Sequence, residues 1–473
     1  MFVSWVHSGI SCWKGSFVDA DLSLERRCYA PLVGPGTRAQ PRRVRRRRQQ
    51  QQPLLAMTTQ VQRNENFSKL QGGYLFPEIA RRRRQYLERH PEASLISLGI
   101  GDTTQPIPPH ICSGLTHGAQ RLGTKEGYSG YGDGEGLYAL RQRIASSIYG
   151  DRVKPEDVFV SDGAKCDIAR IQMVFGNQVT VAVQDPSYPV YVDTAVMVGQ
   201  TGRIDASTQQ YDGIVYMRCD AANDFFPDLR QVPRTDIIFF CSPNNPTGAA
   251  ASRAQLEELV AFARYNGSII VYDAAYAPFI RDPSVPRSIL EIDGAHECAI
   301  EVNSFSKYAG FTGVRLGWTV VPSTLRFADG TPVAKDFGRV MNTAFNGASN
   351  IAQQGGLACL DDAGRAEIER LIDYYIENAR LLREGMESLG FSVHGGRNAP
   401  YIWVHMPGRS SWDVFTEFLE RCQVVTVPGA GFGPAGYDYV RLSAFAPREA
   451  CREAMRRIQE AFGGVTDPAR VSV

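Results

Sequence analysis

The chain has 473 residues with a formal net charge of +1; 43% are hydrophobic and 21% charged, which is typical of a globular protein with room for two domains. It contains no apolar run of about eighteen residues, so we expect no membrane span and no membrane partner. Its ten cysteines form no C-x-x-C pair and no cluster with histidine, which argues against a metal site and against a disulfide framework.

The N-terminal segment is strongly basic. Residues 1–57 contain ten Lys and Arg against three Asp and Glu, a balance of +7 that leaves −6 for the rest of the chain. Most of these cations lie in PRRVRRRRQQQQP, residues 41–53, which could bind nucleic acid. An Arg-rich segment ahead of a globular body is more typical of an organelle transit peptide, so we predict a disordered leader over residues 1–57 and no nucleic-acid partner. Met57 is an alternative start.

Short apolar runs recur from residue 157 onward, and each ends in Gly, Pro, Asp or Ser. Such runs are typical of the buried strands of a largely parallel sheet. The runs are DVFVSDGAK (157–165), QVTVAVQDPSYP (178–189), DIIFFCSPNNPTG (236–248), SIIVYDAAY (268–276) and AIEVNSFSK (299–307). Between the third and the fourth, residues 252–267 begin with a capping box and end in glycine, which predicts a helix. This alternation predicts an α/β sheet, whose ligands gather at the carboxyl ends of its strands.

Two regions differ from this pattern. Residues 204–235 are predicted to be a loop-rich insertion that is poor in strands. After about residue 360, apolar residues at helical spacing predict a long helix ended by Gly390, followed by short strands and a last helix over about 447–462. The sequence therefore predicts a large domain over 106–360, a smaller α+β domain over 361–473, and an arm over 58–105 that contributes to the small domain.

Lys307 lies among small residues in SFSKYAGFTGVRLGW (304–318), directly after a predicted strand. A partly desolvated amine has a lowered pKa and can form a Schiff base with an aldehyde. Most lysines are solvated surface residues, so the S-x-S-K pattern alone is a weak signal, and the hypothesis depends on the residues that accompany it.

Asp273 ends the apolar run IIVYD and needs a partner, because an unpaired buried carboxylate is costly. The pyridinium N–H of pyridoxal 5′-phosphate would be such a partner; a helix cap or an ion pair is the commoner role of a single Asp. Tyr276 could reach the phenolic oxygen of the same ring, and Asn245 in the turn NNPTG (244–248) could donate to it.

A phosphate site is predicted where strand, glycine turn and helix follow one another in SDGAKCDIARI (161–171), because a helix N-terminus offers free N–H groups to an anion. An ordinary βα turn is the alternative. Tyr188 could stack on the cofactor ring or pack in its Pro-bounded loop, and Arg315 could clamp a phosphate with two hydrogen bonds. The residues predicted to hold the phosphate are Gly163, Ala164, Lys165, Ser304, Ser306 and Arg315.

Taken in order, N-P-T-G, D-x-x-Y, S-x-S-K and an arginine eight residues after the lysine resemble the fold-type I pyridoxal-phosphate aminotransferases over about residues 58–465. Within that superfamily, LQGGYLFPEIARR (70–82), SDGAKCDIARIQ (161–172) and FNGASNIAQ (345–353) resemble the LL-diaminopimelate aminotransferases of plants, algae and some bacteria. The resemblance implies an α/β fold with a large domain, whose mostly parallel sheet is flanked by helices, and a smaller α+β domain. It also implies pyridoxal 5′-phosphate as cofactor.

The implied reaction converts tetrahydrodipicolinate and glutamate to LL-diaminopimelate and 2-oxoglutarate in lysine biosynthesis, in the plastid stroma if the leader is a transit peptide. The implied catalytic residues are Lys307, Asp273 and Tyr276. The resemblance also implies a homodimer with shared active sites, in which Tyr131 reaches the cofactor phosphate of the neighbouring subunit. Arg441 would clamp the substrate α-carboxylate. The implied substrate-binding residues are Tyr74, Gly101, Lys165, Asn245, Asn346 and Arg441.

One motif departs from the family pattern. The family sequence is close to G-Y-G-A-E-Q-G, and its acidic residue contacts the distal amine of the substrate. Here residues 130–136 read GYGDGEG, with Gly134 at the acidic position between Asp133 and Glu135. Three alternative functions stay open. The first is an aminotransferase for aromatic, alanine or aspartate substrates, and the second is a lyase or cyclopropane-forming synthase with the same cofactor. The third is a nucleic-acid binder that uses the arginine run.

Overall fold

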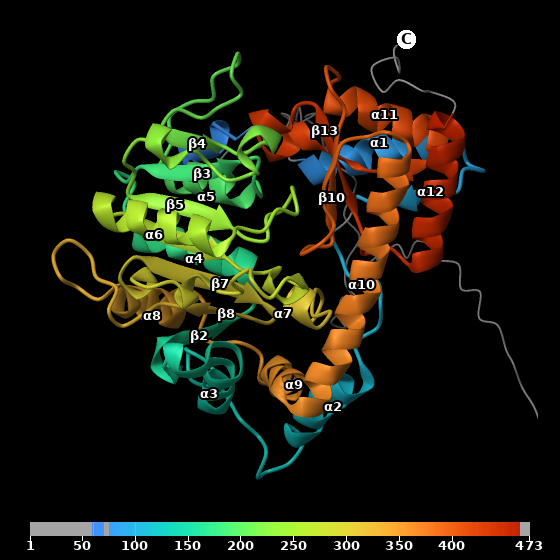
Figure 1. The fold of residues 1–473 in the computed structure, drawn as a ribbon. Helices are drawn as coiled ribbons and strands as arrows, with labels where there is room; N and C mark the ends of the chain where they lie inside the picture. Colours follow the sequence, from blue (N-terminus) through green and yellow to red (C-terminus); the bar gives the residue numbers. More distant parts are fainter. Residues whose placement is uncertain (1–58, 60, 71–74, 100, 464–473) are drawn as a thin grey trace, which may run out of the picture. The chain divides into compact units, whose positions relative to one another are not determined.

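The computed structural model describes residues 59, 61–70, 75–99 and 101–463. From Gln62 onward these residues belong to one compact unit. Its strands form a seven-stranded sheet, a four-stranded sheet and a two-stranded pair (Figure 1).

The seven-stranded sheet has the strand order β2-β8-β7-β6-β5-β3-β4. Neighbouring strands pair in parallel from β7 to β4, whereas β8 is antiparallel to both β2 and β7. The strands are β2 (Val158–Ser161), β3 (Val181–Asp185), β4 (Ile214–Arg218), β5 (Ile237–Cys241), β6 (Ile269–Asp273), β7 (Ala299–Ser304) and β8 (Gly317–Val320).

The five apolar runs identified in the sequence are strands β2, β3, β5, β6 and β7, so this part of the prediction is confirmed. The prediction for residues 204–235 is wrong in one respect, because β4 lies within that range and pairs in parallel with β3. Within it Ile214 and Met217 are buried, Val215 and Tyr216 are half-buried, and the last residue, Arg218, is exposed. An edge strand has one neighbour and is covered less completely, so it lacks the continuous apolar run of the inner strands.

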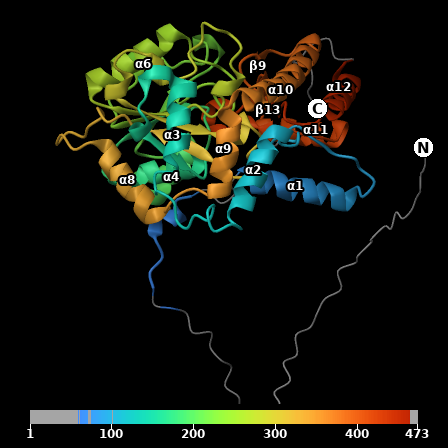
Figure 2. The ribbon, with the colours of Figure 1, turned by 90° about the horizontal axis from the view of Figure 1, so that it is seen from below.

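Helices cover both faces of this sheet because consecutive strand residues point to opposite sides. Ile238 and Phe240 pack in one core with residues of α3, α6 and α9, while Ile237 and Phe239 pack in the other with residues of α4, α5 and α8. Figure 2 shows α3 and α9 with α2, which packs against α9. These helices are α2 (Pro109–Arg121), α3 (Tyr138–Ile144), α4 (Ala164–Val174), α5 (Val190–Val198), α6 (Arg253–Asn266), α8 (Val333–Ala344) and α9 (Asn350–Leu360).

The predicted helix over 252–267 is α6, and its capping box is present: the Ser252 side chain accepts from the Gln255 N–H, and the Gln255 side chain accepts from the Ser252 N–H. Gly267 ends the helix with a left-handed φ of 63°. None of the helices that the structure describes is long and apolar enough to cross a bilayer.

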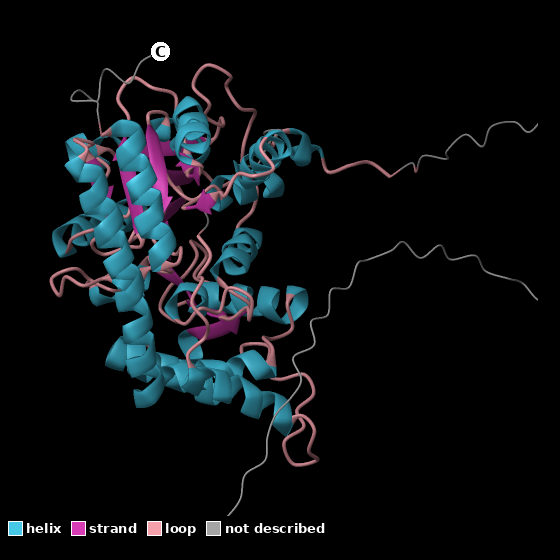
Figure 3. Ribbon diagram, turned by 90° about the vertical axis from the view of Figure 1, so that its right-hand side faces the viewer, coloured by secondary structure: helices cyan, strands magenta, loops and turns pink. Residues whose placement is uncertain are grey.

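The four-stranded sheet has the order β12-β13-β10-β9 and is antiparallel. Its strands are β9 (Val393–Gly395), β10 (Tyr401–His405), β12 (Val427–Pro428) and β13 (Tyr439–Ser443). Helices α11 (Ser411–Cys422) and α12 (Arg448–Phe462) share a core with it. The long helix α10 (Asp362–Ser388) joins the core of the large sheet through its first half and this smaller core through its second half. Figure 3 is seen from the side on which these helices lie in Figure 1, and it shows helices in front of the strands.

The segment before residue 105 joins the smaller sheet region, because β1 (Ile96–Ser97) pairs in parallel with β11 (Val424–Val425). Two further helices, α1 (Leu75–Arg89) and α7 (Phe305–Tyr308), lie near the site described below. The predicted α/β fold, with a mostly parallel sheet and a smaller α+β part, is confirmed. The domain boundaries at residues 58, 106 and 361 stay a prediction.

Candidate active site

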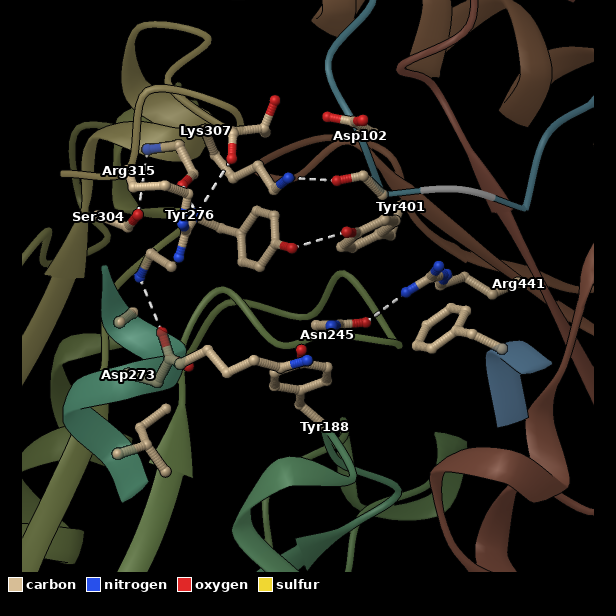
Figure 4. Close-up of a pocket in the computed structure, with 18 residues that line it drawn as sticks. Asp102, Tyr188, Asn245, Asp273, Tyr276, Ser304, Lys307, Arg315, Tyr401 and Arg441 are labelled. Atoms are coloured by element: carbon tan, nitrogen blue, oxygen red, sulfur yellow. Dashed lines mark hydrogen bonds between the residues drawn. The ribbon is translucent and has the colours of Figure 1, made fainter. Parts of the chain in front are cut away.

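A cavity of about 390 Å³ lies where β2, β3, β5, β6 and β7 end, and residues from the smaller sheet line its other side. Parallel strands bring their carboxyl ends to one edge of a sheet, so residues that follow separate strands meet there. Figure 4 shows the result, with Lys307 and Asp273 on one side of the pocket and Arg441 on the other. The sequence-predicted residues that line it are Gly101, Ala164, Lys165, Tyr188, Asn245, Asp273, Tyr276, Ser304, Ser306, Lys307, Arg315 and Arg441.

Lys307 lies in α7, three residues after the end of β7, and its side chain is half-buried. Its amine donates to the carbonyl oxygen of Gly101 and lies 5.3 Å from the centre of the Phe445 ring. Burial lowers the pKa of Lys307 to about 8, the Asp102 carboxylate opposes this shift, and Arg441 and Arg315 add to it. A neutral amine is therefore accessible near neutral pH, as nucleophilic and proton-transfer chemistry requires.

Asp273 is the last residue of β6 and is 6% exposed. One carboxylate oxygen accepts from the Tyr191 hydroxyl at 2.8 Å, and the other accepts from the Ala275 N–H at 3.0 Å. Burial raises the pKa of Asp273, while these two donors counteract the rise. Because it also lines the pocket, this carboxylate can bind a cationic donor inside it.

Anion-binding groups gather at the beginning of α4. The helix has no side-chain cap, so its first N–H groups have no side-chain acceptor, and its first two residues, Ala164 and Lys165, line the pocket together with Arg315. Arg315 donates to the Ser306 hydroxyl at 3.3 Å, and the Ser304 hydroxyl accepts from the Ser306 N–H at 3.0 Å. A Cβ at Gly163 would lie 2.7 Å from a guanidinium nitrogen of Arg315, so only glycine permits this close approach. The group is suited to a phosphate.

The opposite wall of the pocket holds Arg441, a residue of β13 that is 1% exposed. Its guanidinium donates to the Asn245 side-chain oxygen at 2.6 Å and to the Gly99 carbonyl at 2.8 Å. Its Nε has no partner among the described residues. The guanidinium also lies 4.2 Å from the centre of the Tyr401 ring, which fixes its plane. Arg441 is thus held rigidly with donor capacity to spare, as binding a carboxylate requires.

Residues 93–458 match the aminotransferase class I and II family. The chain is also 60% identical to the chloroplastic LL-diaminopimelate aminotransferase of Arabidopsis thaliana, over 85% of this chain and 88% of that protein. The chain belongs to the class I and II aminotransferases. It is 53% identical to the LL-diaminopimelate aminotransferase of Protochlamydia amoebophila, over 85% of this chain and 98% of that protein.

Solved structures agree with this assignment. The L,L-diaminopimelate aminotransferase from Chlamydomonas reinhardtii superimposes on this aminotransferase with a TM-score of 0.83 and 62% identity, covering 86% of this chain and 100% of that one. These comparisons confirm the resemblance inferred from the sequence motifs and the predicted enzyme class.

Some of the predicted residues do not line the pocket. Gly163 is adjacent to it, as its approach to Arg315 shows, but is not part of its lining. Tyr131 is 90% exposed and lies in the segment between α2 and α3, and Asn346 is exposed after α8, with a left-handed φ of 69°. The role of Tyr131 toward a neighbouring subunit and the role of Asn346 in substrate binding stay predictions. Tyr74 lies outside the described residues.

The structure also brings residues to the pocket that motif reasoning missed, among them Phe76, Asp102 and Tyr401. Tyr401 is the first residue of β10, and its hydroxyl shares a 2.6 Å hydrogen bond with the hydroxyl of Tyr276. The sequence predicted this strand but offered no sign that it reaches the other sheet. A Cβ at Gly101 would lie 2.6 Å from the Tyr401 oxygen, so the glycine leaves space for that hydroxyl.

The family implies pyridoxal 5′-phosphate, and the pocket residues of this aminotransferase fit it. An aldehyde requires an amine of lowered pKa, which Lys307 supplies. A pyridinium nitrogen requires a buried acceptor, and Asp273 lines the pocket with only two hydrogen-bond donors described. A phosphate requires concentrated N–H donors, which the beginning of α4 and Arg315 provide.

Proposed function

We propose that this aminotransferase interconverts LL-diaminopimelate and 2-oxoglutarate with tetrahydrodipicolinate and glutamate, and so serves lysine biosynthesis. The observation that carries the reaction class is the meeting of Lys307, Asp273 and Arg441 around one cavity. The substrate is supported by relatives of that name that are 53% to 60% identical over 87% to 98% of their own length.

Pyridoxal 5′-phosphate is the proposed cofactor; when bound, it supplies an electron sink for the bond broken at the α-carbon. Asp273 would hold its ring nitrogen, and Tyr276 and Asn245 would donate to its phenolic oxygen. Tyr188 would lie against the ring. The phosphate would be held by Gly163, Ala164, Lys165, Ser304, Ser306 and Arg315.

The chain's own residues then orient the substrate and move a proton. Arg441 would bind the α-carboxylate, and its contacts with Asn245 and Gly99 leave it little freedom to turn away. This fixes the α-carbon relative to Lys307, whose Nζ would accept the α-proton and later return it. A lysine pKa lowered to about 8 suits a group that must both accept and release a proton.

The test is an assay of purified protein with LL-diaminopimelate and 2-oxoglutarate, following glutamate formation and the visible absorbance of the bound cofactor. Cofactor absorbance that Lys307→Ala removes, together with glutamate formation, is the expected result. Cofactor absorbance without glutamate from this amino donor would contradict the substrate, and protein that binds no cofactor would contradict the whole assignment.

We further propose a homodimer with shared active sites, in which Tyr131 reaches the cofactor phosphate in the neighbouring subunit's pocket. An aromatic side chain that is 90% exposed, as Tyr131 is, favours a contact with a partner. Mixing refolded Lys307→Ala and Tyr131→Ala chains should restore activity that neither has alone, because one site of each hybrid dimer keeps both residues. Mixtures as inactive as the single variants would contradict shared sites.

We also propose that the protein acts in the plastid stroma. Relatives from Arabidopsis thaliana and Oryza sativa are named chloroplastic, and the first 57 residues here carry a balance of +7. A fluorescent protein fused behind residues 1–57 should enter plastids, and a fusion that stays in the cytosol would contradict the proposal.

A further inference from the structure

The pocket contains an exposed carboxylate for which the proposed chemistry has no use. Its charged lining residues are the cations Lys165, Lys307, Arg315 and Arg441 and the carboxylates Asp102 and Asp273. Asp273 is buried and engaged by Tyr191 and Ala275. Asp102 is exposed and makes no hydrogen bond or ion pair with any residue that the structure describes.

Asp102 follows Gly101, whose carbonyl accepts from the amine of Lys307, so it lies next to the reacting centre (Figure 4). Its charge acts on that amine through space. A small amino acid with one ammonium group, such as glutamate, presents mainly carboxylates to the pocket, and the cationic lining residues can bind these carboxylates. A substrate with a second ammonium group needs a further carboxylate in the pocket to bind that group, because the cationic lining repels the ammonium.

We propose that Asp102 binds the distal ammonium group of a diamino dicarboxylate substrate and thereby selects it over mono-amino acids of the same length. This inference rests on the proposed function and adds to it a residue that decides specificity. The ammonium would donate to the Asp102 carboxylate, a charge-assisted hydrogen bond at the open side of the pocket.

The exposure of Asp102 explains how one pocket serves two substrates. A buried carboxylate left without its ammonium partner would be costly whenever glutamate is bound. An exposed carboxylate is solvated by water instead, so glutamate binds without that penalty. The position therefore favours the diamino substrate without excluding the donor with one amine.

Two other carboxylates compete for this role, and the structure treats them differently. The Glu135 carboxylate is paired with Arg141 at 3.0 Å, which holds it within its own chain. Asp133 is exposed and does not line the pocket of its own chain. Of these three carboxylates, Asp102 is the one that lines the pocket of its own chain and can meet the distal ammonium there.

The experiment compares two substrates that differ by the distal amine alone, LL-diaminopimelate and L-2-aminopimelate, with wild type, Asp102→Asn and Asp102→Glu. Loss of one charge-assisted contact predicts that Asp102→Asn lowers kcat/KM for LL-diaminopimelate about tenfold or more, mainly through KM, and changes L-2-aminopimelate less than about threefold. Asp102→Glu should regain part of the preference. Asp151→Asn, an exposed aspartate outside the pocket, is the matched control.

Each other outcome overturns a defined statement. An equal loss for both substrates would mean that Asp102 acts only on the Lys307 amine, which both substrates use. A selective loss in Asp133→Asn and none in Asp102→Asn would move the role to residues 130–136. A wild-type enzyme that turns over L-2-aminopimelate but not LL-diaminopimelate would overturn the proposed function and the role of Asp102 together.

Discussion

The pocket has two walls of different origin. Residues of the first wall follow the strands of the large sheet, and two of their contacts are local in sequence: the Asp273 carboxylate accepts from the Ala275 N–H, and the Ser304 hydroxyl accepts from the Ser306 N–H. The second wall comes from β10, β13 and the segment after β1, and Arg441 there is held by Asn245, 196 residues away, and by Gly99, 342 residues away.

This difference in origin goes with a difference in proposed role: the first wall carries out the reaction, and the second wall selects the substrate. The first wall offers the amine, the buried carboxylate and the phosphate donors, which any reaction with this cofactor needs. The second wall offers Arg441, Tyr401 and Asp102, which line the side of the pocket where we propose that the substrate binds. Substitutions in the first wall should therefore affect all substrates through kcat, and substitutions in the second should act mainly through KM.

The largest effect is expected from the first wall. Replacing Lys307 by alanine removes the group that we propose takes up and returns the α-proton, so kcat should fall about ten-thousandfold for every amino donor. Stopped-flow absorbance of each half-reaction would measure it, with Lys154→Ala, an exposed lysine, as the control. A variant that kept more than about one per cent of wild-type kcat would contradict the assigned role.

The second wall is tested by Arg441→Lys. Lysine keeps the charge but lacks the planar guanidinium, which donates to Asn245 and Gly99 from separate nitrogens and stacks on Tyr401, so KM should rise about 10- to 100-fold for all α-amino acids. Steady-state kinetics with glutamate and with LL-diaminopimelate would show whether both rise together. Arg448→Lys, a half-buried arginine outside the pocket, is the control. A change in kcat alone would remove the distinction between the walls.

A smaller effect is expected from Tyr191→Phe, which acts through Asp273. The Tyr191 hydroxyl stabilises the charged carboxylate, so its loss should raise the pKa of Asp273 further. The carboxylate should then bind the ring nitrogen of the cofactor less strongly. We expect about a tenfold lower kcat with unchanged KM, and weaker retention of the cofactor on dialysis. Tyr272→Phe, a buried tyrosine of β6 outside the pocket, should change neither. Equal cofactor retention by the two variants would assign Tyr191 a packing role only.

The smallest effect concerns a carboxylate that belongs to neither wall. Glu301 of β7 is 1% exposed and accepts from the hydroxyls of Tyr149 and Ser288 and from the side chain of Asn303. Burial raises its pKa to about 7, above its value in the unfolded chain. Between the two pKa values the folded protein binds more protons, so the free energy of unfolding should fall as pH rises to about 7 and then level off.

Glu301→Gln should flatten that slope, by at most about 1.4 kcal/mol per pH unit, while the kcat near pH 8 stays within about twofold. Urea unfolding between about pH 5 and 8 would measure it, against the exposed control Glu257→Gln. An unchanged slope would mean that Glu301 titrates alike in both states.

Prediction from the sequence succeeded where one strand and the few residues after it contain the signal. The runs that became β2, β3, β5, β6 and β7 each end in a polar motif, so the sequence could predict that Asp273, Lys307 and the residues at the beginning of α4 meet at one edge of the sheet. Strand β4 was missed because an edge strand is only partly covered and shows no continuous apolar run. Tyr401 was missed because nothing in its own strand indicates which neighbour lies opposite.

The sequence by itself determined the inner strands of the large sheet, the capping box of α6 and the chemical groups at one edge of that sheet, because these depend on side-chain patterning and on contacts over a few residues. Only the tertiary structure decided that β10, β13 and the segment around Gly101 face that edge. It therefore also decided that Tyr401 meets Tyr276 and that Asp102 lies beside Lys307. Such pairings depend on how two parts of the chain, each with its own core, pack together, and no local pattern encodes that packing.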